Sequence, residues 1–314
     1  MTSGLIELAA GDASATLAPG EGGLLLSLNV AGHELLVSRR EGAGPVPRYG
    51  SFLMTPWVAE LSLGQLEFRG QHAQIPPNEG RHAIHGLVAT GAWEVADVGP
   101  AAAKLVRRLE PPWPFGGTVV QDFKLDARGI TLEAEIRAED SAMPAALGWH
   151  PWFACPDPDV VRVGVDAASE LELGDETLPT GAIRPVDGDS DLRGAPVLGG
   201  RQLDNVFVGA ASPALLKVPG LELRLQFDPA IDIVTVYTSP GAVCIEPWSA
   251  WPDAIRMAAA GHPSGIQVLE PGESLRRWTR WEWSGMDNGG ERWVPSSMRP
   301  LPSEWTKSPR RIPG

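Results

Sequence analysis

The chain has 314 residues, with 26 Lys and Arg against 39 Asp and Glu, so its formal net charge is −13 at pH 7. This length suits one large domain, and the negative charge argues against nucleic-acid binding because phosphate backbones would be repelled. Two cysteines exclude a disulfide-stapled scaffold, while 36 Gly and 30 Pro indicate many turns between short strands. The first residues lack a signal-peptide pattern and no apolar stretch is long enough to span a membrane, so we expect a cytoplasmic protein without membrane contact.

Alternation of apolar and polar residues predicts strands along most of the chain. In chain order these strands cover residues 24–30, 119–126, 130–139, 161–165, 221–227 and 231–237. Turn residues at 127–129 and at 228–230 predict that the strands on either side pair as two hairpins. No window of helical length shows a sustained helical period, so the sequence predicts an all-β fold.

Four long segments rich in Gly and Pro show little pattern and are predicted to be loops: 38–56, 74–90, 142–160 and 186–206. Sites on a rigid β scaffold are commonly built on such loops, and His82, His85 and His150 all fall in them. The composition changes again at Gly285, which predicts a β domain over residues 1–284 and a Pro-rich tail over 285–314. We expect the tail to wrap over its own domain, with a disordered tail or a dimer arm as the alternatives.

Glu246 is the most informative single residue, because it ends an otherwise apolar strand. It shares one strand face with Ala242 and Cys244. A carboxylate among such neighbours loses its water, so it is either paired or functional. The structural alternative is a buried ion pair with an arginine such as Arg256.

Tryptophans crowd the two strings around His150 and Glu246. Core packing is the ordinary explanation, but Trp152 and Trp248 would also form an aromatic surface on which a sugar ring could stack. The spacing of His82 and His85 is only a weak zinc signal, and no His-Glu-x-x-His string is present, so we predict no metal site.

Four strings, in this order, resemble those of the aldose 1-epimerase (galactose mutarotase) family. They are Ile84-His85-Gly86, His150-Pro151-Trp152-Phe153, Asp204-Asn205-Val206-Phe207, and Cys244-Ile245-Glu246 followed by Pro252-Asp253-Ala254. The resemblance covers about residues 5–283. It implies a large antiparallel β-sandwich, the galactose mutarotase-like supersandwich. It also implies interconversion of the α and β anomers of a free hexose, with no metal or organic cofactor.

The same resemblance implies a role for each matched residue. Glu246 is similar to the family's general base and His150 to its general acid. His85 and Asp204 are similar to the groups that orient the sugar. Anomer exchange opens a hemiacetal, in which the C1 hydroxyl loses a proton while the ring oxygen gains one, so one base and one acid suffice.

One position departs from the family pattern. Where the family carries an Asn-Arg pair whose arginine contacts the sugar, this chain has Ala59-Glu60. Arg48 or Arg81 would have to supply the missing donor, and we include Arg81 among the predicted substrate-binding residues. The lost arginine and the acidic charge make a phosphorylated hexose the less favoured substrate.

The first reading is therefore an aldose 1-epimerase-like isomerase that acts on a small sugar as a monomer or homodimer. A catalytically silent carbohydrate-binding protein on the same fold is the main alternative, supported by the missing Asn-Arg pair. A glycosidase that uses Asp204 and Glu246 as paired carboxylates is a third reading.

Overall fold

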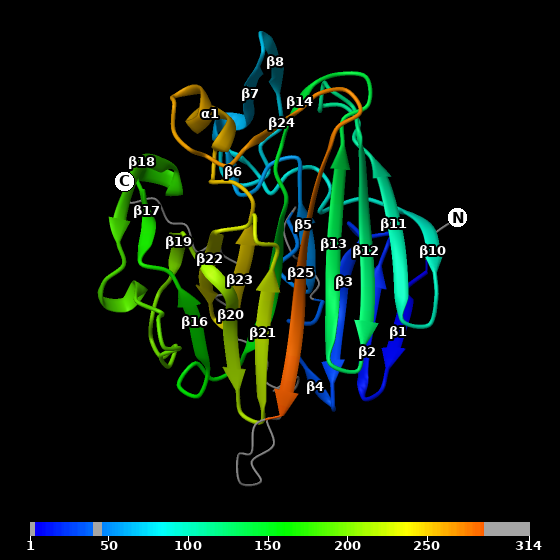
Figure 1. Ribbon diagram of the computed structural model, residues 1–314, viewed down its shortest axis with the longest axis vertical. Helices are drawn as coiled ribbons and strands as arrows, with labels where there is room; N and C mark the ends of the chain where they lie inside the picture. The colour runs from blue at the N-terminus through cyan, green and yellow to red at the C-terminus, as the bar shows by residue number, and fades with distance from the viewer. Residues whose placement is uncertain (1–3, 40–45, 286–314) are drawn as a thin grey trace.

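The computed structural model describes residues 4–39 and 46–285, which form two large antiparallel sheets that face each other (Figure 1). The larger sheet has eleven strands, in the spatial order β1 (Ile6–Ala10), β2 (Ala13–Ala18), β3 (Leu24–Val30), β5 (Ser51–Met54), β15 (Gly148–Cys155), β23 (Gly241–Trp248), β22 (Ile233–Ser239), β19 (Asp204–Val208), β17 (Ser169–Leu173) and β18 (Pro179–Pro185), with β4 (His33–Glu34) beside β3. The second has eight, in the order β10 (Glu94–Val98), β11 (Ala102–Arg108), β12 (Thr118–Asp126), β13 (Gly129–Arg137), β25 (Ser274–Gly285), β21 (Leu221–Phe227), β20 (Ala211–Val218) and β16 (Arg162–Asp166).

Shorter elements gather at the top of Figure 1, over one end of the sandwich. They are the strand pairs β6 (Glu60–Leu61) with β9 (Ala83–Ile84), β7 (Gln65–Phe68) with β8 (Gln71–Gln74) and β14 (Met143–Ala145) with β24 (Gln267–Leu269), together with the helix α1 (Ala254–Ala259). Three single-turn 3₁₀ segments complete the described elements: Ser62–Gly64, Asp175–Thr177 and Gly188–Ser190.

The centre of the larger sheet is buried on both faces. Along β23, Val243 and Ile245 join the main core between the two sheets, whereas Cys244 and Trp248 join a second apolar cluster. Because successive side chains of a strand point to opposite faces, this second cluster lies on the face turned away from the other sheet. The loops and short strands cover that face, and the predicted site residue Glu246 lies on it.

The predicted β-sandwich class is confirmed, and so is the first hairpin, in which β12 pairs with β13 and Asp126 lies opposite Gly129. The second predicted hairpin is wrong. β21 pairs with β20 and β25 in the smaller sheet, whereas β22 pairs with β19 and β23 in the larger one. The turn residues 228–230 therefore carry the chain from one sheet to the other, which alternation within each strand does not reveal.

The prediction of a loop over residues 142–160 is also wrong, since β15 runs through it and carries His150. Almost every residue of β15 is buried, so the strand lacks the polar face that alternation would show. The helix α1 was not expected either. Of the predicted tail, only Gly285 lies within the described residues, where it ends β25; the rest of the tail and the expected domain boundary stay predictions.

Candidate active site

Strand pairing alone brings the predicted catalytic residues together. Gly148 lies opposite Trp248 and Trp152 opposite Cys244, so the same register sets His150 beside Glu246 on neighbouring strands. Paired residues share a sheet face, and their Cβ atoms are about 5 Å apart. The sheet thus presents an imidazole next to a carboxylate on the face beneath the loops.

The neighbouring strands extend this arrangement into two rows across the sheet. One row contains Glu246, His150, Thr235 on β22 and Phe52 on β5. The row beside it contains Asp204 on β19, Tyr237 on β22, Cys244 and Trp152. Sequence reasoning named the members on β15, β19 and β23 but missed Thr235 and Tyr237. Their alternation with buried Val234 and Val236 could have marked them as facing the site.

A single pocket is lined by six of these eight residues, all but Phe52 and Cys244, and by others from the loops above the sheet. The predicted site residues His85, His150, Trp152, Asp204, Glu246 and Trp248 all line it. Glu60, Arg48, Glu79, Thr177, Thr235 and Tyr237 are among the further polar residues of its wall.

His150 and Glu246 form the centre of the pocket. His150 Nε2 lies 3.5 Å from Glu246 Oε1, and the two side chains are 7% and 2% exposed. The imidazole is stacked between Phe52 and Trp152, with ring centroids 4.8 and 5.1 Å away, and His85 meets it edge-on at 5.0 Å. Packing on three sides fixes the imidazole next to the carboxylate.

Burial pushes both central groups toward their neutral forms. The pKa of His150 falls well below its ordinary value, first because of burial and then because of the nearby His85. The pKa of Glu246 rises well above its ordinary value, again chiefly through burial, with the charges of Asp204 and Glu60 adding to it. One proton is shared by the two groups. It lies on Glu246 when both groups are neutral and on His150 when the pair is a carboxylate and an imidazolium, so both forms hold the same number of protons.

Several buried polar atoms at the pocket make no hydrogen bond to any described residue. They are Glu246 Oε2, His150 Nδ1, Thr235 Oγ1 and the indole nitrogen of Trp152. Buried polar groups are normally paired, so a cluster of such atoms beside one pocket suits a ligand rich in hydroxyl groups. Aromatic rings beside these atoms give the pocket an apolar surface as well.

His85 enters the pocket from a loop with an unusual backbone. Its φ is 64° and that of Gly86 is 72°, and the His85 amide donates to the carbonyl of Ala59 at 2.8 Å. A Cβ atom on Gly86 would lie 2.0 Å from the carbonyl oxygen of Thr55. Glycine is therefore required after His85, which gives the His-Gly string a structural reason.

Glu60 lies on the loop side of the same pocket, and two neighbouring segments contact its backbone. Its carbonyl accepts a 2.8 Å hydrogen bond from the amide of Asp253, and it pairs with Ile84 across β6 and β9. The side chain is buried, and Thr177 Oγ1 lies 2.9 Å from Glu60 Oε1. The position at which the chain departs from the family pattern that it otherwise resembles thus presents a buried, hydrogen-bonded carboxylate to the pocket.

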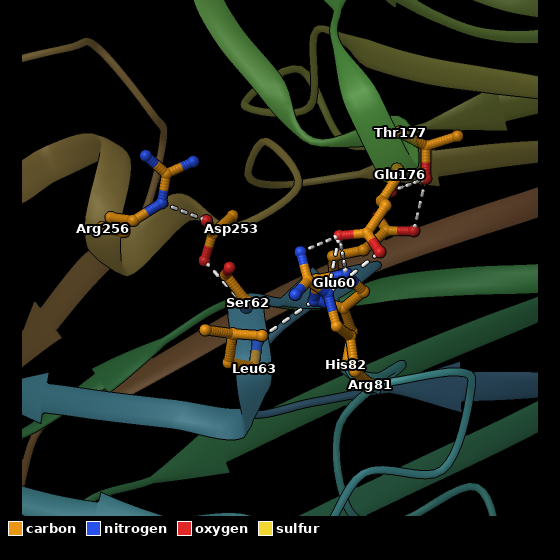
Figure 2. A network of polar contacts seen from close by, with 9 residues as sticks. All are labelled: Glu60, Ser62, Leu63, Arg81, His82, Glu176, Thr177, Asp253 and Arg256. Carbon is orange, nitrogen blue, oxygen red and sulfur yellow. Dashed lines mark hydrogen bonds and ion pairs between the residues drawn. The ribbon is translucent and has the colours of Figure 1, made fainter. Parts of the chain in front are cut away.

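A polar network beside Glu60 holds the loop that carries Thr177 (Figure 2). Arg81 and His82 both reach Glu176, with Arg81 Nη2 at 2.7 Å and His82 Nε2 at 3.0 Å from its Oε2. His82 Nδ1 accepts from the amide of Leu63, so Nε2 of the neutral ring carries the proton and donates it. These contacts place Glu176 and Thr177 over the pocket despite positive φ angles of 57° and 61°.

The two arginines suggested as replacement donors lie in different places. Arg48 lines the pocket, where its Nη2 is 3.5 Å from Glu79 Oε1. Arg81 is not among the pocket-lining residues and extends instead to Glu176, with 68% of its side chain exposed. The structure thus brings Arg48, not Arg81, to the predicted site.

The structural alternative for Glu246 is wrong. Arg256 makes its ion pair with Asp253, the residue that precedes α1, and not with Glu246. Asp253 also accepts from the amide of Ser62 at 3.1 Å, so this carboxylate joins the loop of β6 to α1 (Figure 2). Glu246 is left facing the pocket.

One set of side chains could approach a metal ion. The ligand atoms of His150, Cys244 and Glu246 lie within 4.8 Å of one another, and all three residues are buried. These donor types suit zinc. Burial raises the pKa of the Cys244 thiol well above its ordinary value, however, and a metal needs the thiolate. Without a metal ion the thiol therefore stays protonated, and the expectation of no metal site stays a prediction.

A sequence model of the aldose 1-epimerase family matches residues 4–282. The chain belongs to this family. YihR, an uncharacterized protein of Escherichia coli K12, is 25% identical over 280 residues, which cover 84% of this chain and 87% of that protein. The predicted family is thereby confirmed.

Solved structures of other proteins share the fold. The GalM/aldose epimerase homologue of C. elegans has a TM-score of 0.78 at 20% identity, covering 91% of this chain and 100% of that one. A galactose mutarotase-like protein of Clostridium acetobutylicum has a TM-score of 0.78 at 17% identity, covering 89% and 95%. None of the helices in the described part of the chain has the length and hydropathy to cross a bilayer.

Proposed function

We propose that the protein interconverts the α and β anomers of a free sugar, with Glu246 and His150 moving the two protons. The observation that carries this proposal is their juxtaposition: His150 Nε2 lies 3.5 Å from Glu246 Oε1 in a pocket lined by aromatic rings and buried polar atoms. Membership of the aldose 1-epimerase family supports the same reaction class.

The reaction starts with the cyclic sugar in the pocket, with its C1 hydroxyl near Glu246 and its ring oxygen near His150. Glu246 takes the proton of the C1 hydroxyl while His150 gives a proton to the ring oxygen, and the C1–O5 bond breaks to leave an open-chain aldehyde. Rotation about C1–C2 and reclosure with the proton transfers reversed yield the other anomer. Each such group contributes about 10²–10⁴-fold to the rate.

Burial affects the protonation states of Glu246 and His150. Burial favours the uncharged forms of both groups, as their pKa shifts indicate. The charged pair holds the same proton count, so no proton has to enter or leave before the reaction begins. Hydroxyl groups of a bound sugar can donate to the Glu246 carboxylate and lower the cost of its ionised form. His85, Asp204, Trp152 and Trp248 would orient the sugar around the pair.

The direct test is polarimetry of freshly dissolved α-glucose, α-galactose and a set of pentoses, with and without the purified protein. We expect at least one sugar to reach its equilibrium rotation faster in proportion to protein concentration. Heat-inactivated protein is the control.

The same samples separate the rival functions. Calorimetric binding of a free sugar without faster anomer exchange would replace the proposal with a silent carbohydrate-binding protein. Release of reducing ends from a glycoside would support a glycosidase. The expected cytoplasmic location and the monomeric or dimeric state stay predictions.

A further inference from the structure

The pocket wall has an uneven charge. Four carboxylate residues line it, Glu60, Glu79, Asp204 and Glu246. Among the lining residues of the described chain, Arg48 is the single arginine or lysine, and it already faces Glu79 at 3.5 Å. Because burial pushes Glu246 toward its neutral form, the negative charge that a ligand meets comes chiefly from Glu60 and Asp204.

Glu60 contributes to this imbalance from a fixed position. Its residue is 6% exposed, its carboxylate lies 2.9 Å from the Thr177 hydroxyl, and its carbonyl accepts from Asp253. A held carboxylate needs no rearrangement to meet a ligand, so its charge acts on whatever enters the pocket.

The charge of Glu60 also acts on another carboxyl group of the pocket. Glu60 and Asp204 both line the pocket with Glu246, and the charge of each raises the pKa of Glu246, so these carboxylates repel one another. Glu246 is itself 2% exposed, and its Oε2 has no hydrogen-bond partner among the described residues. A positive group on the ligand would relieve this repulsion, while an added negative group would increase it.

We propose that the pocket selects sugars by charge, binding protonated amino sugars more tightly than neutral sugars and phosphorylated sugars least, and that Glu60 sets this preference. The inference rests on the proposed function in one respect, that the pocket binds a sugar. Inside a protein the interaction between two charges a few ångströms apart is several times stronger than in water, so one carboxylate changes affinity about tenfold.

The experiment compares ligands that differ only in charge. Calorimetry measures the binding of glucose and galactose, their 2-amino and 6-amino derivatives and their 6-phosphates, near pH 6.5, where the amines are protonated. For the wild type we expect at least one amino derivative to bind about tenfold more tightly than its parent. The matching 6-phosphate should bind about tenfold more weakly.

Variants then assign the preference to Glu60. Glu60→Gln keeps an oxygen for Thr177 but removes the charge, and it should reduce the amine preference about tenfold. Glu60→Asp keeps the charge and should retain the preference. Glu67→Gln removes a carboxylate that is 76% exposed and does not line the pocket, so it controls for the net charge of the whole protein.

Each outcome bears on one proposal only. Equal binding across the charge series, tighter binding of the phosphates, or an unchanged preference in Glu60→Gln would overturn the charge selection. Any of these results could coexist with faster mutarotation of a neutral sugar, which would leave the proposed function intact. A charge ranking without faster mutarotation would instead remove the proposed reaction and keep the selection.

Discussion

His150 and Glu246 stand on neighbouring strands in the middle of the larger sheet, whereas Glu60 and Thr177 reach the same pocket from the segments above it. The sheet side is fixed by strand register and by packing against the main core. The loop side is fixed by exposed ion pairs and by backbone hydrogen bonds. The comparison suggests that the sheet supplies the chemistry and the loops supply selection, and each prediction below tests that division.

The largest effect on the mutarotation rate is expected from substitutions on the sheet side of the pocket. Glu246→Gln and His150→Ala should each lower the kcat of mutarotation by about 10²–10⁴-fold, because each removes one proton-transfer group. Polarimetry measures the rate. Burial already disfavours the charged form of Glu246, as its raised pKa indicates, so Glu246→Gln should unfold at the same denaturant concentration as the wild type or a higher one.

Glu170 is the matched control because it is another buried carboxylate of the larger sheet, outside the pocket. It bonds to Arg184, Ser190 and Asn205. Glu170→Gln should therefore keep its rate and lose about 1–3 kcal/mol of stability. A Glu170→Gln variant as inactive as Glu246→Gln would show that any buried charge of this sheet affects the rate.

Gly86 tests whether the loop side depends on backbone geometry. Gly86→Ala puts a Cβ atom 2.0 Å from the Thr55 carbonyl at a φ of 72°, so we expect a loss of about 2–4 kcal/mol of unfolding free energy and a displaced His85. Denaturant unfolding measures the first and sugar binding the second. Gly32→Ala has a similar φ of 84° but open space around it, and it should cost only about 1 kcal/mol. Equal losses in both variants would mean that φ alone matters.

Asp204 connects the two sides through charge. Because its carboxylate raises the pKa of Glu246, Asp204→Asn should lower that pKa. The rate should fall at high pH when the Glu246–His150 pair loses its last proton, so the alkaline limb of kcat/KM should move to lower pH in this variant. The acid limb, set by adding a second proton to the pair, should stay below the ordinary histidine range, since burial lowers the pKa of His150. An alkaline limb that stays in place in Asp204→Asn would remove Asp204 from this electrostatic role.

The sequence predicted the sheet side better than the loop side, for physical reasons. Alternation within β23 set Glu246 on the face of Cys244, and the four family strings pointed to His150 and Asp204. Strand register could not be predicted, because residues 148 and 248 pair only in the folded chain and no local sequence pattern indicates that pairing. Thr235 and Tyr237 were missed for that reason.

The loop side depends on contacts between distant segments. Arg81 was predicted to meet the sugar, yet it bonds to Glu176, which is 95 residues away. Nothing in the string around Arg81 distinguishes a ligand contact from an ion pair. Glu60 was noticed only as a departure from the family pattern, and its place in the pocket wall became clear from the fold.

The smallest effect is expected from the ion pair that holds Thr177 over the pocket. Arg81→Gln should raise KM about threefold and leave kcat unchanged, because His82 still bonds to Glu176 and exposed ion pairs contribute little to stability. Mutarotation kinetics at several sugar concentrations separate the two constants. Raising the salt concentration should increase KM in the wild type more than in Arg81→Gln, since salt screens exposed charges.

Arg193→Gln is the matched control for this ion pair. Arg193 bonds to Asp191 through two nitrogens, much as Arg81 bonds to Glu176, but Asp191 has no pocket-lining neighbour, whereas Glu176 precedes the pocket-lining Thr177. Its loss should leave KM unchanged. Arg81 first, and then His82, lower the pKa of Glu176, which adds a pH test. The Arg81–Glu176 pair stabilises the loop at pH values above the ordinary carboxyl pKa, and this stabilisation is lost as the pH falls through the lowered pKa of Glu176. If KM stays the same in Arg81→Gln, or rises equally in Arg193→Gln, the loop does not need this contact to shape the pocket, and selection would rest on Glu60 and its backbone bonds alone.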